Sequence, residues 1–200
     1  FKTVSNWAKN IVKGAGVRVK VTGSENIPKG NCLFVSNHQG NFDPFIMLAY
    51  INKPFGFIAK AELMRIPIIS MWMKEIHCVF MDRKDIRKSL NAINEGIDNL
   101  KKGYSMMVFP EGTISKCEKM LEFKKGSFKL ALKSGVPIVP VSIDGSFKIF
   151  KNNKIRSIVP SDVRLVIDKP IFIDKLDKDQ KKNLARTVQS IIESNLNGYN

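Results

Sequence analysis

The sequence contains few of the residues that build disulfide frameworks and metal sites. Its 200 residues include only three cysteines and two histidines, and neither a Cys-x-x-Cys nor a His-x-x-x-His pair occurs. Because the cysteine count is odd and Cys32 and Cys78 lie in apolar runs, we interpret the cysteines as reduced packing residues, which favours a cytosolic location. We expect no structural or catalytic metal ion.

Long apolar runs, low-complexity stretches, internal repeats and Pro/Gly-rich linkers are also missing. The longest apolar segments fall well short of the ~18 to 20 residues that span a bilayer, so we expect any membrane association to be peripheral. With 44% hydrophobic residues, the chain can bury one sizeable core. We therefore predict a single domain over residues 1–200.

Acidic residues are scarce relative to basic ones. There are 18 Asp and Glu against 33 Lys and Arg, which gives a net charge of +15. This charge would attract lipid surfaces, acidic proteins, phosphorylated ligands and nucleic acid. Nucleic acid is disfavoured, because the charge comes without an aromatic-basic stacking motif, a helix-turn-helix signal or a zinc knuckle.

Short apolar runs typical of strands alternate with helical patterns along much of the chain. Their alternation predicts an α/β sheet with helices on both faces. The expected strands are 17–22, 33–36, 56–59, 77–81, 106–109, 138–143 and 163–167. One helix is predicted by apolar residues three and four apart and is closed by Gly103, and a last helix is expected over about 178–196. The apolar stripe of the first helix is Ile86, Leu90, Ile93, Ile97 and Leu100.

The segment 37–44 places an imidazole and a carboxylate five positions apart between a strand and a helix. We expect Asp43 to cap the helix and Pro44 to be its first residue. A four-residue turn can fold Asp43 back onto His38, fix one imidazole nitrogen and leave the other free to accept a proton. The ordinary alternative is a plain helix cap beside a surface histidine.

Two further polar clusters follow strand ends. Glu111, Gly112 and Thr113 come after the run 105–109, and Arg83 comes after the run 77–81. Open α/β sheets bind their ligands at the carboxyl ends of their strands. All three clusters are therefore expected on one edge of the sheet.

Four ordered blocks in this sequence resemble the glycerolipid acyltransferase family, most closely its bacterial 1-acyl-sn-glycerol-3-phosphate acyltransferases. The resemblance runs from about residue 19 to residue 169. It implies a mixed, mostly parallel sheet of the glycerol-3-phosphate acyltransferase type and transfer of a fatty acyl group from a thioester to a glycerophosphate hydroxyl. The blocks are Asn37-His38 with Asp43-Pro44, Phe80-Met81-Asp82-Arg83, Phe109-Pro110-Glu111-Gly112-Thr113 and 136–141.

The expected mechanism has no covalent enzyme intermediate. His38, oriented by Asp43, removes the proton from the free hydroxyl of lysophosphatidate as that oxygen attacks the thioester carbonyl. The tetrahedral intermediate expels the thiol, and its oxyanion needs donors such as backbone amides around Gly40 or Gly112. No cofactor is implied, because coenzyme A or acyl carrier protein delivers the acyl group as a substrate.

The resemblance also suggests which residues bind the acceptor. Arg83 and Lys60 would hold its phosphate, and arginine suits a fork of two hydrogen bonds. Glu111 is assigned to the glycerol hydroxyls or to holding a basic neighbour. Gly112, Thr113 and Lys116 complete the predicted substrate site.

One departure from the family pattern concerns the acceptor. Ile114 stands where the family usually has an arginine. A phosphate contact is then either lost or moved to Lys116, Lys124 or Lys125. Alternatively, the chain acts on another lysophospholipid or on glycerol 3-phosphate itself.

The first sixteen residues form the pattern of a basic amphipathic helix that can lie on an anionic membrane surface, or pack on the domain. The chain starts at Phe1 rather than at a methionine, and members of the family that it resembles often carry an apolar segment at this end. The expected location is the cytoplasmic face of the cell membrane, with peripheral attachment or an anchor absent from this chain. Segment 63–73 can line an acyl-chain channel or belong to the core.

Two rival functions use different residues. A thiol enzyme would pair Cys78 or Cys117 with His77, but neighbours in a strand point to opposite faces, which disfavours His77 with Cys78. A non-catalytic protein that binds lipid surfaces through its basic charge is the more serious rival, and it makes no demand on His38.

Overall fold

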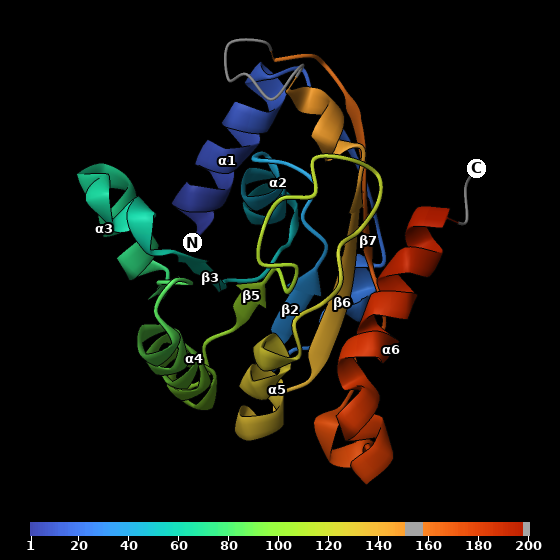
Figure 1. Ribbon diagram of the computed structural model, residues 1–200. Coiled ribbons are helices and arrows are strands. Elements are labelled where there is room, and N and C mark those ends of the chain that lie inside the picture. The colour runs from blue at the N-terminus through green and yellow to red at the C-terminus, as the bar shows by residue number, and fades with distance from the viewer. Residues whose placement is uncertain (151–157, 198–200) are drawn as a thin grey trace.

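In the computed structural model, which describes residues 1–150 and 158–197, seven strands form one sheet in the order β1-β7-β6-β2-β5-β3-β4 (Figure 1). Strands β6, β2, β5, β3 and β4 are mutually parallel, β7 is antiparallel to β6, and β1 is parallel to β7. The prediction of a mixed, mostly parallel α/β sheet is therefore confirmed. The strands are β1 (Arg18–Thr22), β2 (Leu33–Ser36), β3 (Gly56–Lys60), β4 (Val79–Met81), β5 (Met106–Val108), β6 (Ile138–Asp144) and β7 (Asp162–Ile167).

Helices cover both faces of the sheet (Figure 1). Helices α1 and α2 share one core cluster, and α4, α5 and α6 share the other. Strand β2 contributes Phe34 to the first cluster and Leu33 and Val35 to the second, as alternation along a strand requires. The helices are α1 (Lys2–Gly14), α2 (Asp43–Tyr50), α3 (Pro67–Glu75), α4 (Ile86–Lys101), α5 (Lys129–Ser134) and α6 (Lys178–Asn197), with 3-10 turns η1 (Ser24–Asn26), η2 (Ala61–Arg65), η3 (Lys125–Phe128), η4 (Ser146–Ile149) and η6 (Ile173–Lys175).

Helix α4 follows its predicted bounds, but its apolar stripe is buried only in part. Asp85 caps the helix by accepting hydrogen bonds from the backbone amides of Arg87 and Lys88. Of the predicted stripe, Ile97 and Leu100 are buried, whereas Ile86 is 79% exposed. The contacts of α4 with the second cluster thus begin beyond its first turn.

The predicted strand 77–81 begins two residues late, at Val79. His77 has a φ of 58°, which is left-handed and incompatible with a strand, and its ring stacks on Tyr104 with 3.7 Å between ring centroids. The prediction that His77 and Cys78 are neighbours in a strand was therefore wrong. A thiol enzyme that uses Cys78 is disfavoured for another reason, because burial raises the pKa of Cys78 to about 12.

The predicted N-terminal helix is present as α1. Ala8 and Val12 are buried against the domain, while Trp7 is 53% exposed and meets the Phe45 ring edge-on at 5.7 Å between centroids. One side of α1 thus packs on the domain. None of the helices within residues 1–150 and 158–197 combines the length and apolarity needed to cross a bilayer.

Segment 63–73 is divided between η2 and α3. Leu63 and Met73 pack against the first core cluster, but Met71 and Trp72 are 55% and 47% exposed. The interpretation of segment 63–73 as core was therefore wrong for its exposed large apolar residues Met64, Ile66, Met71 and Trp72. The acyl-channel interpretation stays a prediction.

Candidate active site

The carboxyl ends of the parallel strands bring the three predicted polar clusters to one edge of the sheet. His38 follows β2, Glu111 follows β5, and Arg83 follows β4. Strand β2 pairs with β5, so the turns after these two strands are neighbours in sheet order. Strand β3 lies between β5 and β4, so the turn after β4 is one strand further along the same edge. This edge is where the sequence placed the site.

His38 and Asp43 form a hydrogen-bonded pair. His38 Nδ1 lies 2.7 Å from Asp43 Oδ2, the carboxylate is fully buried, and the histidine side chain is 15% exposed. The same Oδ2 atom accepts hydrogen bonds from the amides of Gln39 (2.7 Å) and Gly40 (2.9 Å). The carboxylate fixes Nδ1 and leaves Nε2 without a hydrogen-bond partner in the described part of the chain.

The expectation that Asp43 caps α2 was wrong. The helix begins at Asp43 itself, Phe42 occupies the cap position without a side-chain hydrogen bond, and Pro44 lies one residue further in. The carboxylate cannot cap the helix because it turns back onto the loop of residues 38–40. Asp43 thus serves the imidazole and the turn.

The turn that carries His38 is held to neighbouring elements by Asn37 and Phe109, two residues of the sequence blocks to which no role was assigned. The side chain of Asn37 donates to the carbonyl of Ile143 (2.8 Å) and accepts from its amide (2.9 Å). The ring of His38 stacks on Phe109 with 4.2 Å between centroids. A polar residue at the end of a fully buried strand was the available signal for Asn37, since a buried amide must find partners.

Glu111 connects the turn after β5 to the turn after β2. It is buried, its Oε1 accepts from the amide of His38 (2.6 Å), and its Oε2 accepts from the amide of Leu121 (2.9 Å). Burial raises the pKa of Glu111, opposed by these two hydrogen bonds. Of the two alternatives for Glu111, the basic neighbour is replaced by two backbone amides, and the contact with glycerol hydroxyls stays a prediction.

Gly112 is contacted by two cationic side chains. Arg83 Nη1 donates to the Gly112 carbonyl oxygen. The side chain of Lys124 lies over Gly112, with Nζ 2.7 Å from the point where a Cβ would stand. Gly112 also has a φ of 74°, so both its backbone and its surroundings favour glycine.

The remaining predicted site residues lie on the same edge or in the segment after it, without a described contact to His38. Lys60 ends β3 and is exposed, Thr113 is exposed, and Lys116 is exposed with a φ of 62°. Their binding roles stay predictions. Between this segment and the catalytic turn, the amide of Ser115 donates to the carbonyl of His38 (2.8 Å).

Of the backbone amides around Gly40 and Gly112, those of the two glycines themselves already have partners, and an oxyanion role for amides of these turns stays a prediction. The Gly40 amide donates to Asp43, and the Gly112 amide donates to the carbonyl of Phe109 (3.1 Å).

Within residues 1–150 and 158–197, no group of three or more His, Cys, Asp or Glu side chains has the geometry to hold a metal ion.

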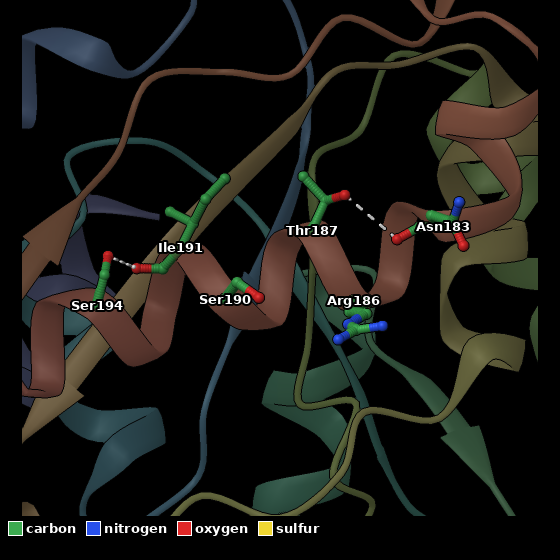
Figure 2. A pocket seen from close by; sticks show the side chains of 6 residues that line it. All are labelled: Asn183, Arg186, Thr187, Ser190, Ile191 and Ser194. Atoms are coloured by element: carbon green, nitrogen blue, oxygen red, sulfur yellow. Dashed lines mark hydrogen bonds between the residues drawn. The ribbon is translucent and has the colours of Figure 1, made fainter.

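A separate depression of about 500 Å³ lies along α6, remote in sequence from the predicted site (Figure 2). Two of its hydroxyl groups turn back onto their own helix, because Thr187 donates to the carbonyl of Asn183 and Ser194 to that of Ile191. These hydroxyls stabilise local backbone groups, so we assign no chemistry to this surface. Its lining residues are Asn183, Arg186, Thr187, Ser190, Ile191 and Ser194.

Comparisons with known proteins identify the family of the chain. The model of the Acyltransferase family matches residues 18–144. The 1-acyl-sn-glycerol-3-phosphate acyltransferase of Borreliella burgdorferi is 35% identical over 183 residues, which are 91% of this chain and 73% of that protein. The chloroplastic 1-acyl-sn-glycerol-3-phosphate acyltransferase BAT2 of Brassica napus is 36% identical over 162 residues, which are 80% of this chain and 47% of that protein.

A solved structure supports the same assignment. The crystal structure of the 1-acyl-sn-glycerophosphate (LPA) acyltransferase PlsC from Thermotoga maritima matches with a TM-score of 0.87 and 32% identity, over 98% of this chain and 77% of that one. The chain thus spans about half the length of the Brassica napus relative and about three quarters of the bacterial ones. From the family match and these identities, we conclude that the chain belongs to the acyltransferase family.

Proposed function

We propose that the chain is a 1-acyl-sn-glycerol-3-phosphate O-acyltransferase. It transfers a fatty acyl group from an acyl thioester to the sn-2 hydroxyl of lysophosphatidate and so makes phosphatidate for phospholipid synthesis. The observation that carries this proposal is the His38 and Asp43 pair, with 2.7 Å between Nδ1 and Oδ2 and with Nε2 unpartnered in the described chain. The names of the relatives supply the substrate class.

The pair suits general-base catalysis of acyl transfer. His38 Nε2 takes the proton of the acceptor hydroxyl as that oxygen bonds to the thioester carbonyl carbon. The buried Asp43 carboxylate stabilises the imidazolium that forms. When the tetrahedral intermediate collapses, the carbon–sulfur bond breaks and the imidazolium returns the proton to the departing thiolate. No side chain becomes acylated.

Substrates arrive from two sources in this proposal. Coenzyme A or acyl carrier protein brings the acyl chain, and the acceptor comes from a membrane surface. The net charge of +15 and the exposed Trp7 and Trp72 support attachment to the anionic, cytoplasmic face of the membrane.

The direct test is incubation of the purified chain with radiolabelled lysophosphatidate and an acyl thioester. Labelled phosphatidate is the expected product, and parallel reactions with glycerol 3-phosphate or another lysophospholipid identify the preferred acceptor. If neither the coenzyme A thioester nor the carrier-protein thioester gives labelled phosphatidate, the proposal is contradicted. Vesicle binding without any acyl transfer would instead identify a lipid-surface protein.

A further inference from the structure

Two cationic side chains lie beside Gly112, and neither takes part in the proton transfer of the proposed reaction. The three heavy atoms nearest the point where a Cβ on Gly112 would lie all belong to Lys124: Nζ at 2.7 Å, Cε at 3.1 Å and Cδ at 3.4 Å. Arg83 donates to the carbonyl oxygen of the same glycine. Two cationic side chains from distant parts of the sequence therefore meet at one residue.

Neither cation has a carboxylate partner in the part of the chain that the structure describes. The ion pairs formed within residues 1–150 and 158–197 include neither Arg83 nor Lys124. Burial lowers the pKa of Arg83, and the attraction of Glu62 opposes that change without forming an ion pair. Two positive groups at one glycine repel each other, and a bound anion would remove that repulsion.

Backbone contacts hold this cationic pair next to the catalytic turn. The amide of Lys124 donates to the carbonyl of Pro110 (3.1 Å), which fixes residue 124 beside the turn after β5. The preceding residue of Gly112 is Glu111, which accepts from the amide of His38 at 2.6 Å. An anion bound at Gly112 would thus lie one residue from Glu111, which accepts the hydrogen bond from the backbone amide of His38.

The simpler explanation is that the aliphatic part of Lys124 covers a glycine while its ammonium group remains in water. That explanation accounts for the contact of Cδ and Cε, but it gives no reason for an unpaired arginine at the same residue. It also predicts that removal of the ammonium group has no effect on acceptor binding.

We propose that Lys124, together with Arg83, binds the phosphate of the acceptor and replaces the arginine that Ile114 displaces. The proposal rests on the proposed function and selects one of the three lysines considered from the sequence. Ile114 offers no charge, and the atoms that approach Gly112 most closely are those of Lys124 rather than Lys116 or Lys125. The ligand class is a glycerophosphate headgroup.

Steady-state kinetics test this assignment through the Michaelis constants of the two substrates. Lys124→Ala should raise the constant for lysophosphatidate about tenfold or more and leave that for the acyl thioester within about twofold, because only the acceptor carries a phosphate at this position. Arg83→Ala should act in the same direction. Lys129→Ala, an exposed lysine in the same part of the chain, is the matched control and should match wild type.

Restoring the missing charge at its family position gives a second, independent result. In the double variant Ile114→Arg with Lys124→Ala, the constant for lysophosphatidate should return to within about threefold of wild type, since either cation can pair with the phosphate. A well-folded Lys124→Ala protein with unchanged constants, or with equal rises for both substrates, would overturn the proposal. So would a selective rise in Lys125→Ala instead.

Chemical labelling separates failure of this site from failure of the proposed function. Reductive methylation of Lys124, followed by mass spectrometry, should slow in the presence of sn-glycerol 3-phosphate but not glycerol, and Lys129 should be unaffected. If the wild-type chain makes no phosphatidate yet shows this protection, the acceptor assignment fails while the anion site stands. Identical Lys124 labelling with and without glycerol 3-phosphate, or equal protection by inorganic phosphate, would overturn the headgroup site.

Discussion

The amide of His38 donates a 2.6 Å hydrogen bond to Oε1 of Glu111, which joins the turn after β2 to the turn after β5. The second oxygen of Glu111 accepts from the amide of Leu121, so one buried side chain ties three separate segments together. The position of His38, the proposed base, thus depends on a residue that bonds its backbone amide. Glu111 is a positioning residue in this account.

Glu111→Gln should destabilise the protein and slow the reaction. The amide of glutamine has one acceptor oxygen, so one of the two backbone N–H groups loses its partner at a cost of about 1 to 3 kcal/mol. We expect urea denaturation to show that loss and kcat to fall, with little change in either Michaelis constant. Unchanged stability and kcat would show that the two hydrogen bonds do not position His38.

The pKa of Glu111 predicts how the stability of wild type relative to Glu111→Gln depends on pH. Burial raises the pKa of Glu111 above its ordinary value of 4.5, so the folded protein holds this proton more tightly than the unfolded chain does. The contribution of Glu111 to stability is therefore fully present below the unfolded pKa and is lost as pH rises through the folded one. Thermal melts across acidic pH should show that the stability of wild type relative to Glu111→Gln falls as pH rises through the folded pKa of Glu111 and then levels off. A difference that grows with pH would contradict the raised pKa.

Asp43→Asn should slow catalysis on the order of a hundredfold or more and leave the fold nearly intact. Oδ2 accepts from Nδ1 of His38 and from two backbone amides, whereas Oδ1 is buried and has no hydrogen-bond partner among the described residues. The asparagine oxygen can replace Oδ2, and its amide group can occupy the site of Oδ1. Only the charge beside the imidazole is then lost. Measured kcat and melting temperature separate the two effects, and an unaltered kcat would mean that Asp43 only shapes the turn.

Thiol labelling tests the rival cysteine chemistry. Burial raises the pKa of Cys32 and Cys78 to about 12, so at pH 8 roughly one such thiol in ten thousand is ionised. Cys117 is exposed. A thiol reagent should therefore modify one cysteine in the native protein and three after unfolding, and Cys117→Ser should retain full acyl transfer. Loss of activity in Cys117→Ser would revive the thiol mechanism.

Membrane attachment should depend on the exposed tryptophans of α1 and α3. Trp7→Ser and Trp72→Ser should each weaken binding to vesicles that contain anionic lipid, and binding should weaken further as salt screens the basic charge. Ile86→Ser is the matched control, because Ile86 is 79% exposed but lies on α4. Sedimentation with vesicles measures the bound fraction. Equal binding by all three variants would locate the lipid contact elsewhere.

The sequence predicted the sheet and the contact between His38 and Asp43 because both depend on local patterns. Buried strand runs and the turn after each of them are visible in a single chain, and so is the five-residue spacing of His38 and Asp43. The start of β4 was missed because a left-handed residue at His77 interrupts an apolar run that looks continuous in the sequence. The capping role of Asp43 was wrong because three donors in the preceding turn draw its carboxylate away from the helix.

Contacts between distant segments could not be predicted. The bond of Glu111 to the amide of His38 spans 73 residues, and those between Asn37 and Ile143 span 106. The approach of Lys124 to Gly112 likewise depends on how the segment after residue 113 folds back, which no periodicity encodes. The sequence therefore named three candidate lysines, and the structure shows that the side chain of Lys124 lies over Gly112.

The most direct test of the central claim is phosphatidate synthesis by His38→Ala, measured with radiolabelled lysophosphatidate and an acyl thioester. The imidazole supplies the base in this account, so the variant should fold as wild type and lose turnover by a factor of at least about a hundred. His77→Ala is the control, because His77 stacks on Tyr104 in the turn before β4 and has no role in the proposed chemistry. A His38→Ala protein that makes phosphatidate at the wild-type rate would contradict the account.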